Sequence, residues 1–358
     1  MYNHYMTTKT ASDNRNISID LLKVFAIFGV LVHHYCNTTF GAALAFVPPR
    51  SASELILYFL DMLAHSSVDV FVLITGYFMA GRTEVSKAKP VKLLIQTAVY
   101  SAIGITIIAL TGVQQELTPA KAIGYYLCIY WFVFIFIALY LASPYINKAL
   151  DGLEMSKLRM VVLGLVILFS CFPFATNLLS FHAGIDMRWA STITYMGDAD
   201  GYSIVQFVVM YVIGYMLKKT DIGKIGFGRS FCMFAGVVII HYALAIFYRT
   251  SYGYVPVLFN YNSPFIIAEA TLAFVVFSNL RIRRGSLISR ISASSFSVYI
   301  YHIYVIKHLG IESAVTGSPL LMVLHLLISC LAMFIAGWLL SEIYNLISGL
   351  VLKLIRSH

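Results

Sequence analysis

The sequence predicts an all-α membrane protein with about ten transmembrane helices and both termini in the cytoplasm. Three observations support this prediction: an apolar composition, a series of apolar runs of spanning length, and an uneven distribution of Lys and Arg between alternate loops. Apolar residues make up 59% of the 358 residues and charged residues only 11%, whereas soluble domains have about 25% charged residues. The alternation of short strands expected of an outer-membrane β-barrel is absent, so the spanning elements are expected to be helices.

The apolar runs have the length that a bilayer requires. A hydrocarbon core of about 30 Å is crossed by a helix of about 17–25 residues, and polar or charged segments separate the runs. We expect one helix from each of the runs at residues 17–38, 57–80, 91–111, 123–146, 160–177, 202–217, 231–248, 263–280, 293–310 and 319–350.

The basic residues indicate the orientation of these helices. On one predicted side lie Lys9, Arg15, Arg82, Lys87, Lys89, Lys92, Lys148, Lys157, Arg159, Lys218, Lys219, Lys224, Arg229, Arg281, Arg283, Arg284, Arg290, Lys353 and Arg356. The other side has only Arg50, Lys121, Arg188, Arg249 and Lys307, and Lys23 lies inside the first span. Cytoplasmic loops are enriched in Lys and Arg, so this asymmetry of 19 to 5 places the richer side in the cytoplasm.

The whole chain is expected to form one membrane-embedded domain, residues 1–358, with a polar N-terminal tail at residues 1–16. The net charge of +9 is explained by cytoplasmic loops that lie beside anionic lipid. We therefore expect membrane lipid and not nucleic acid as a partner. The five cysteines are scattered without the spacing of a metal site, and no metal is expected.

The first span carries three ionisable residues on one helical face. Asp20, Lys23 and His34 share this face because the 11 residues from Lys23 to His34 make about three turns, and they separate these two residues by about 16 Å. Ionisable groups inside a membrane are costly, so they are functional candidates by default. The alternative is an interfacial ion pair between Asp20 and Lys23, with His34 as a packing residue.

The second span places His65, Asp69 and Gly76 on one face. Gly76 would let a ligand or a neighbouring helix approach closely. Asp69 requires a partner, for which Lys23 or an arginine is the natural candidate. The alternative is a structural ion pair combined with close helix packing.

The loop after this span, RTEVSKAKPVK, places four cations beside helix starts: Arg82, Lys87, Lys89 and Lys92, of which the last two flank Pro90 at the start of the next helix. Such a cluster can hold the phosphates of a nucleotide-bearing cosubstrate. The same cations are also expected from the cytoplasmic excess of Lys and Arg alone.

Further polar residues occur in later spans. Glu269 is expected to be a proton-relay group or the partner of a buried cation. Ser295, Tyr299 and His302 share a face that would form either the polar wall of a cavity or hydrogen bonds between helices. Trp131 is expected to be an aromatic belt residue or part of a cavity lining.

Four segments, taken together and in this order, resemble the integral-membrane acyltransferase-3 family over most of the chain. They are IDLLKVFAIFGVLVHH, SVDVFVLITGYF, YWFVFIFIALYLASP and ISRISASSFSVYIYHIYVI. Lys23 stands where this family usually has Arg, and Thr75 where it has Ser. Lys89 and Lys92 are the only match to its paired arginines. Lysine keeps the charge but loses the planar bidentate fork of arginine.

The resemblance implies a membrane O-acetyltransferase of the cell membrane. It would move an acetyl group from acetyl-CoA to a hydroxyl of a surface polysaccharide or lipid-linked sugar. His34 would be the base, or would briefly carry the acyl group. Asp20 and Asp69 would position the cations, Lys23 among them, and fix the imidazole tautomer. CoA would be bound by Lys23, Lys89, Lys92, Thr75, Gly76 and Tyr77. The acceptor would contact Trp131, Tyr299, His302 and Glu269.

Sugar hydroxyls also suit the polar and aromatic side chains of the outer loop, although these suit an ordinary exposed loop equally well. These side chains are His182, Asp186, Arg188, Trp189, Asp198 and Asp200.

Two other classes fit the same residues. In a transporter or exporter of a glycan or lipid precursor, the buried His, Asp and Glu side chains would be coupling groups. In a regulatory or anchoring subunit, they would only stabilise the bundle. Consumption of acetyl-CoA with release of a free thiol distinguishes an enzyme from either alternative.

Overall fold

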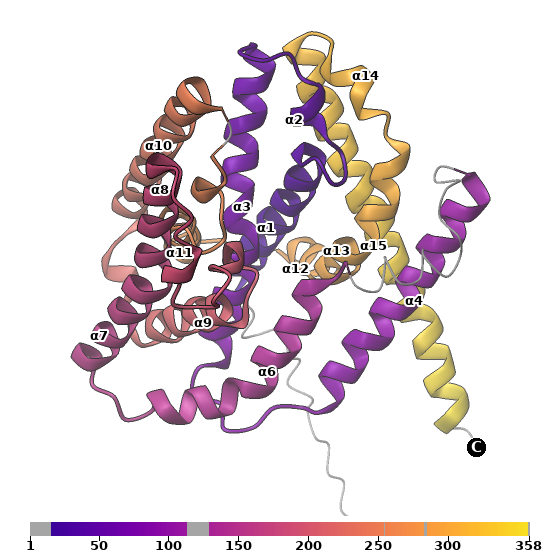
Figure 1. The fold of residues 1–358 in the computed structure, drawn as a ribbon. Coiled ribbons are helices and arrows are strands. Elements are labelled where there is room, and N and C mark those ends of the chain that lie inside the picture. The colour runs from indigo at the N-terminus through magenta and orange to yellow at the C-terminus, as the bar shows by residue number, and fades with distance from the viewer. Residues whose placement is uncertain (1–15, 113–128, 254, 283–284, 357–358) are drawn as a thin grey trace, which may run out of the picture.

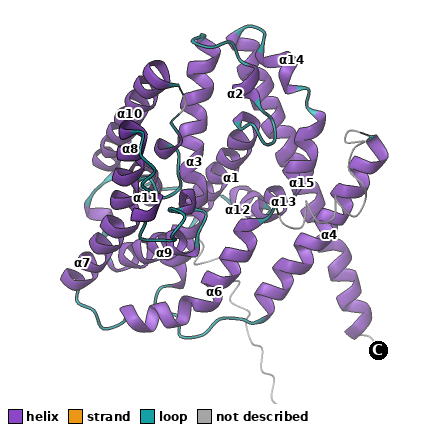
Figure 2. Ribbon diagram, in the orientation of Figure 1, coloured by secondary structure: helices purple, strands orange, loops and turns teal. Residues whose placement is uncertain are grey.

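The computed structural model describes residues 16–112, 129–253, 255–282 and 285–356, and within them all regular secondary structure is helical (Figure 2). Seven of the described helices are long and apolar enough to cross a membrane. The predicted class, a polytopic all-α membrane protein, is therefore confirmed. Most of the expected polar tail, residues 1–15, lies outside the described residues.

The long helices follow the apolar runs closely, and short helices occur between them. The α-helices are α1 (Ile17–Cys36), α2 (Ala43–Phe46), α3 (Ala52–Met79), α4 (Ala88–Thr111), α6 (Trp131–Leu150), α7 (Met155–Val166), α8 (Phe172–Ala183), α9 (Ile204–Lys219), α10 (Phe227–Tyr252), α11 (Pro264–Ser278), α12 (Ser286–Ala293), α13 (Ser295–Val305), α14 (Ile311–Val315) and α15 (Pro319–Arg356). A π-helical turn, η1 (Ile167–Cys171), joins α7 to α8. The short 3₁₀ helices are η2 (Arg188–Ala190), η3 (Ala199–Gly201), η4 (Ile222–Lys224), η5 (Pro256–Leu258) and η6 (Ile306–His308).

Most expected helix boundaries differ from the structure by a few residues, and three expected helices differ in other ways. The expected helix at 123–146 begins in the described residues at Trp131, and residues 123–128 lie outside them. The expected helix at 160–177 extends over Met155–Ala183, because the π turn continues the helix without a break. The expected helix at 293–310 corresponds to α13 and the 3₁₀ helix η6, which ends at His308, and the additional helix α12 precedes it at Ser286–Ala293.

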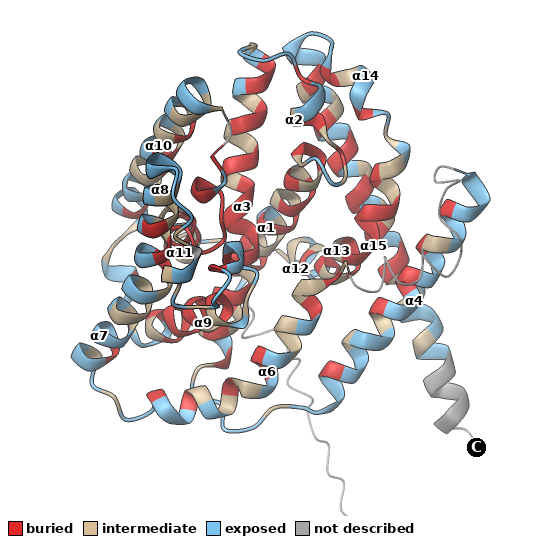
Figure 3. Cartoon of the chain, in the orientation of Figure 1, coloured by how far each residue is buried: buried red, intermediate tan, exposed pale blue. Residues whose placement is uncertain are grey.

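Helices α1 and α3 form the centre of the molecule (Figure 1). α3 packs against α1, α9 and α11, and α10 packs against α11. On the other side α13 packs against α15 and α4. Buried residues follow the faces of α1, α3, α9 and α13 that point toward these contacts (Figure 3). The polar residues of α1 and α3 are therefore enclosed by other helices.

Local capping fixes where the two central helices begin. The side chain of Asn16 accepts a hydrogen bond from the Ile19 amide at the start of α1. Ser51 accepts one from the Glu54 amide at the start of α3. Caps of this kind satisfy backbone donors that the first helical turn leaves free. Glu54 also pairs with Arg249, so the start of α3 is tied to α10.

Gly76 and Gly214 bring α3 and α9 into backbone contact. A Cβ atom on Gly76 would overlap the carbonyl group of Tyr211, and one on Gly214 would overlap that of Leu73. Small residues permit such close crossings between membrane helices. In this structure Gly76 therefore serves close helix packing, which was one of its two expected roles.

Candidate functional site

A cavity of about 420 Å³ lies between α1, α3, α6 and α13. Its wall contains histidines on one part and aromatic rings on another, and it includes four of the residues expected from the sequence: His34, Trp131, Tyr299 and His302. The complete lining is Val30, His33, His34, Asn37, Thr39, Phe40, Ala64, Val68, Ile129, Tyr130, Trp131, Phe132, Tyr202, Tyr261, Tyr299, His302 and Ile303.

The backbone of α1 fixes the tautomer of His34. Its Nδ1 lies 2.8 Å from the carbonyl oxygen of Val30, one turn earlier. A carbonyl oxygen only accepts hydrogen bonds, so Nδ1 carries the proton. The Nε2 atom of the neutral ring therefore has a free lone pair. Asp20 and Asp69 were expected to fix this tautomer, and that expectation is wrong, because Val30 does so.

His302 has the same arrangement on α13. Its Nδ1 lies 3.1 Å from the Val298 carbonyl oxygen, and its buried Nε2 has no hydrogen-bond partner among the described residues. The rings of His34 and His302 meet edge to face with their centroids 4.6 Å apart. Two unprotonated nitrogens from two helices thus belong to one wall of the cavity.

A third histidine of this wall belongs to a buried hydrogen-bonded cluster. His33 Nδ1 lies 2.9 Å from Asp61 Oδ1, and His65 Nδ1 lies 2.7 Å from the Asp61 carbonyl oxygen. The ring centroids of His33 and His65 are 4.3 Å apart. Sequence reasoning missed Asp61 and left His33 off the functional face of α1. The available signal was the spacing of four residues between Asp61 and His65, which places both on one helical face.

Aromatic rings form the rest of the wall. Trp131 packs against Tyr202 and Tyr261 at centroid distances of 4.5 and 5.7 Å, and Tyr299 packs against Phe132 at 5.4 Å. Burial raises the pKa of Tyr202 and of Tyr261, so both phenols are protonated at neutral pH. Of the two roles expected for Trp131 and Tyr299, the structure supports the cavity wall.

Asp69 is linked to the cavity wall through the side chain of Gln206. It is fully buried on α3, and its Oδ2 accepts a hydrogen bond from Gln206 Nε2 at 2.9 Å. The same nitrogen donates to the carbonyl oxygen of Tyr261. The expected cationic partner, Lys23 or an arginine, is therefore wrong: a neutral amide on α9 takes this place and links Asp69 to Tyr261.

Glu269 does not line the cavity. It is fully buried on α11, and its Oε1 lies 2.8 Å from Nδ1 of His241 on α10. The other nitrogen of His241 lies 3.0 Å from the Leu258 carbonyl oxygen. The expectation that Glu269 contacts the acceptor is wrong for this cavity. Its partner is the buried imidazole of His241, and the two expected roles, a proton relay or the partner of a buried cation, stay predictions.

Asp20 and Lys23 lie at the opposite end of α1 from His34. They form an ion pair of 3.2 Å, as the alternative interpretation of this span expected. Asp20 also accepts hydrogen bonds from the hydroxyls of Ser289 and Ser292 at 2.7 and 3.2 Å. This carboxylate thereby joins α1 to α12.

The remaining residues expected at a CoA site are dispersed. Lys89 Nζ lies 4.4 Å from the centre of the Tyr140 ring. Lys92 lines a separate groove between α4 and α15. The Thr75 hydroxyl donates to the Phe71 carbonyl oxygen, and the ring of Tyr77 lies beneath Lys218. These residues do not share one cavity with each other or with His34.

A basic groove does exist near the end of α3, and it contains different cations. Its volume is about 910 Å³. Asn147 on α6 donates to the carbonyl oxygens of Met79 and Arg82, which holds the two walls together. The groove is lined by Arg82, Thr83, Glu84, Val85, Lys87, Leu141, Pro144, Tyr145, Asn147, Lys148 and Asp151. Arg82 and Lys87 belong to the basic loop that was expected to be able to hold phosphates, whereas Lys148 was counted only toward topology, since nothing in the sequence indicates that its segment meets this loop.

Comparison with known proteins gives one match. Residues 16–342 match the model of the acyltransferase domain family known as acyltransferase-3. This match includes every described residue of the cavity and of the basic groove. No curated protein and no solved structure matches the chain significantly.

Proposed function

This chain belongs to the acyltransferase-3 family, and we propose that it moves an acetyl group from acetyl-CoA to a hydroxyl of a surface polysaccharide or lipid-linked sugar. The observation that carries this proposal is the state of His34. A membrane-embedded imidazole with its proton fixed on Nδ1 lines a cavity, and its Nε2 is free to take a proton. A hydroxyl is a poor nucleophile near neutral pH and requires such a base.

In the proposed reaction Nε2 of His34 removes the proton of the acceptor hydroxyl as its oxygen attacks the thioester carbonyl. The carbon–oxygen bond forms, and the carbon–sulfur bond of the thioester then breaks. The leaving thiolate takes the proton back from His34, so the products are an acetyl ester and free CoA thiol. His302, whose ring meets that of His34, offers a second acceptor for a hydroxyl or a water held between the two rings.

The aromatic part of the wall supports a sugar as the acceptor. The wall offers the ring faces of Trp131, Tyr202 and Tyr261. The two tyrosines also have phenol groups, which donate and accept hydrogen bonds. Aromatic side chains combine apolar contact area with a polar group, which suits a ring with apolar C–H faces and hydroxyl edges. Asn37 and Thr39 add polar groups to the lining.

The basic groove supports an anionic donor. Arg82, Lys87 and Lys148 all line it, and guanidinium and ammonium groups bind phosphates through charge-assisted hydrogen bonds. We assign the nucleotide end of acetyl-CoA to this groove in place of the dispersed lysines expected from the sequence. With the termini in the cytoplasm, as the basic loops predict, the groove faces the cytosol and His34 lies toward the outer half of the membrane.

The proposal is tested with purified protein in lipid nanodiscs. The sample is incubated with acetyl-CoA, with and without an extract of lipid-linked glycans, and both free thiol and ester-linked acetyl groups are measured. Glycan-dependent release of thiol with matching ester formation is expected. A folded sample that binds no CoA and releases no thiol would contradict the proposal and favour a transporter.

A further inference from the structure

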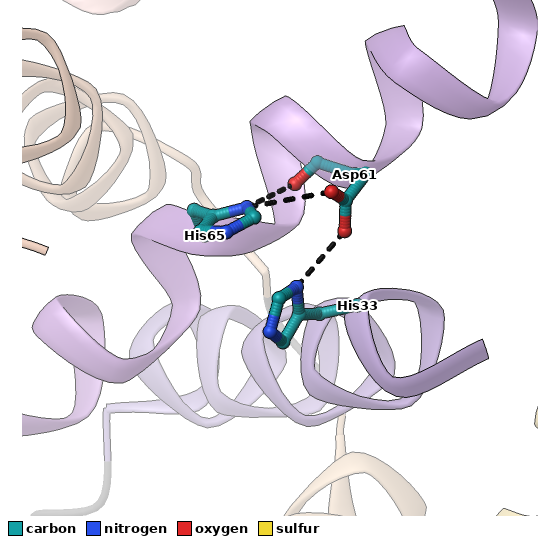
Figure 4. Close-up of side chains that lie close together, drawn as sticks. All are labelled: His33, Asp61 and His65. Atoms are coloured by element: carbon teal, nitrogen blue, oxygen red, sulfur yellow. Dashed lines mark hydrogen bonds and ion pairs between the residues drawn. The ribbon is translucent and has the colours of Figure 1, made fainter. Parts of the chain in front are cut away.

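The cluster of His33, Asp61 and His65 beside the cavity has the composition of a metal site (Figure 4). Each side chain offers one ligand atom, and these atoms all lie within 4.8 Å of one another. Asp61 and His65 are one turn apart on α3, and His33 approaches them from α1 (Figure 4). A similar spacing of four residues places paired ligands on one face of a helix in zinc enzymes.

In the part of the chain that the structure describes, no Lys or Arg forms an ion pair with this cluster. Asp61 is buried in a membrane helix with 6% of its surface exposed. Among the described residues its ion-pair partners are only the two imidazoles, at 2.9 and 3.9 Å. Carboxylates inside membranes are costly unless a cation or a proton compensates them. A bound divalent cation would supply this charge.

The hydrogen bond of His65 fixes which of its two nitrogens could bind a metal. Its Nδ1 donates to the backbone carbonyl of Asp61 at 2.7 Å, which leaves Nε2 unprotonated. In metal sites the second nitrogen of a ligand histidine typically donates to a carbonyl or carboxylate, which fixes the ring and its tautomer. The proton of His65 is therefore already on the nitrogen that would not bind the metal.

The hydrogen-bond partners of His33 show which of its two ring nitrogens carries the proton. Asn37 Oδ1 accepts from the amides of Thr39 and Phe40 at 3.1 and 3.2 Å, so the other end of this amide is the donor Nδ2. That donor lies 3.2 Å from His33 Nε2, and Nε2 must accept. The proton of His33 therefore lies on Nδ1, which donates to Asp61.

We propose that His33, Asp61 and His65 bind a divalent cation of the zinc class, in place of the proton now shared between His33 and Asp61. Two imidazoles and a carboxylate suit Zn²⁺ and Co²⁺ better than Ca²⁺ or Mg²⁺, which prefer oxygen ligands alone. When the cation binds Nδ1 of His33, the ring carries its proton on Nε2. His33 also lines the cavity, so the cation would lie beside it.

Replacement of the shared proton by a cation would change the hydrogen bond between His33 and Asn37. A protonated Nε2 would face the amide donor of Asn37, and two donors repel. The substitution Asn37→Asp replaces that donor with a carboxylate oxygen and retains an acceptor for the turn at Thr39 and Phe40. A carboxylate behind a ligand histidine strengthens metal binding, and loss of such a partner typically costs 10–100-fold in affinity. Asn37→Asp is therefore expected to tighten binding by about tenfold or more.

The experiment uses the full-length protein without a histidine tag, in nanodiscs and stripped of metal with a chelator. Co²⁺ is titrated while its visible absorption is recorded, and Zn²⁺ is then added as a competitor. The wild type is expected to bind one cation per chain. Asp61→Asn and His65→Gln are expected to weaken binding by more than tenfold. His182→Gln, which changes an exposed histidine on α8 paired with Tyr248, is the matched control and should bind as the wild type does.

Gel filtration and thermal unfolding show whether each variant is folded. If Asp61→Asn and His65→Gln do not fold, the tighter binding expected of Asn37→Asp still tests the proposal. Failure of the folded wild type to bind stoichiometric Co²⁺ or Zn²⁺ would overturn the proposal. Equal affinity in the wild type, Asn37→Asp and Asp61→Asn would also overturn it, because surface histidines would then be the ligands. The assay needs no acyl acceptor, so its outcome is independent of the proposed transferase activity.

Discussion

The rings of His34 and His302 lie 4.6 Å apart, and each has its Nδ1 proton tied to the carbonyl four residues earlier on its own helix. Both therefore present an acceptor nitrogen, and two acceptors cannot hydrogen-bond to each other. The described residues supply no donor to Nε2 of His302, and a substrate hydroxyl can be that donor. This geometry links the local structure of two helices to the proposed chemistry.

The first prediction concerns His302. His302→Gln keeps a polar side chain of similar size but removes the imidazole lone pair. We expect the turnover number for acetyl transfer to fall about 10²-fold, the lower range for loss of a proton-transfer group, with little change in thermal unfolding. The control is His325→Gln, because both nitrogens of His325 are hydrogen-bonded elsewhere, to Tyr35 and to the Leu309 carbonyl. An unchanged rate in His302→Gln would remove His302 from the reaction.

The second prediction concerns the aromatic wall. Trp131→Leu removes the ring that packs against Tyr202 and Tyr261. Stacking on a sugar stabilises the substrate and the transition state alike, so we expect KM for the acceptor to rise and kcat to change little. Initial rates measured over a range of glycan concentrations separate these two constants. Phe231→Leu, which changes a ring on α10 with 50% of its surface exposed, should leave both unchanged.

The third prediction concerns the basic groove. Arg82→Gln and Lys148→Gln each remove one cation that lines it. A charge-assisted hydrogen bond contributes about 1.5 kcal/mol or more, so each variant should raise KM for acetyl-CoA about tenfold. Lys224→Gln serves as the control, since Lys224 pairs with Asp221 on the surface. If Lys89→Gln raises KM while both groove variants do not, the donor site is the one expected from the sequence.

The fourth prediction concerns the loop before α9. Burial, and then the charge of Asp198, raise the pKa of Asp200, so the ionised form of Asp200 is disfavoured in the folded protein. A raised carboxyl pKa lowers stability at pH values above the folded pKa, and this cost disappears as the pH falls below the ordinary pKa of an aspartate. Asp200→Asn keeps an acceptor for Asn260 and removes the charge.

Thermal unfolding measured from pH 7 to pH 3 tests this effect. The midpoint of Asp200→Asn is expected to exceed that of the wild type by about 2 °C at pH 7, and the excess should shrink as the pH falls. A difference that stays constant over this range would contradict the raised pKa. An effect of asparagine on the left-handed backbone at this position, with φ of 52°, would be independent of pH.

The positions of the helices could be predicted from the sequence because hydropathy and length determine them. The runs around His34, Asp69 and Tyr299 fall within α1, α3 and α13. The ion pair of Asp20 and Lys23 could also be anticipated, since residues three apart share one helical face. The short helix α12 could not, because its sequence SLISRISA contains Arg290 and three serines and gives no apolar run.

The partners of buried groups could not be predicted, because they depend on which helices pack together. Asp69 meets Gln206 from a helix more than a hundred residues away, and Glu269 meets His241. Asp20 and Asp69 were expected to fix the tautomer of His34, although the carbonyl group of Val30 on the same helix fixes it. The basic groove could not be predicted for the same reason, because Arg82 and Lys148 become neighbours only when the ends of α3 and α6 meet.

The role of His34 as the base for acyl transfer is tested by comparing the wild type with His34→Ala in nanodiscs. The measurement is glycan-dependent release of thiol from acetyl-CoA, with His182→Ala as the matched control. We expect His34→Ala to lose about 10²–10⁴-fold in rate while it remains folded and still binds acetyl-CoA. Thiol release at the wild-type rate in His34→Ala would contradict the assignment and leave the reaction without its proposed base.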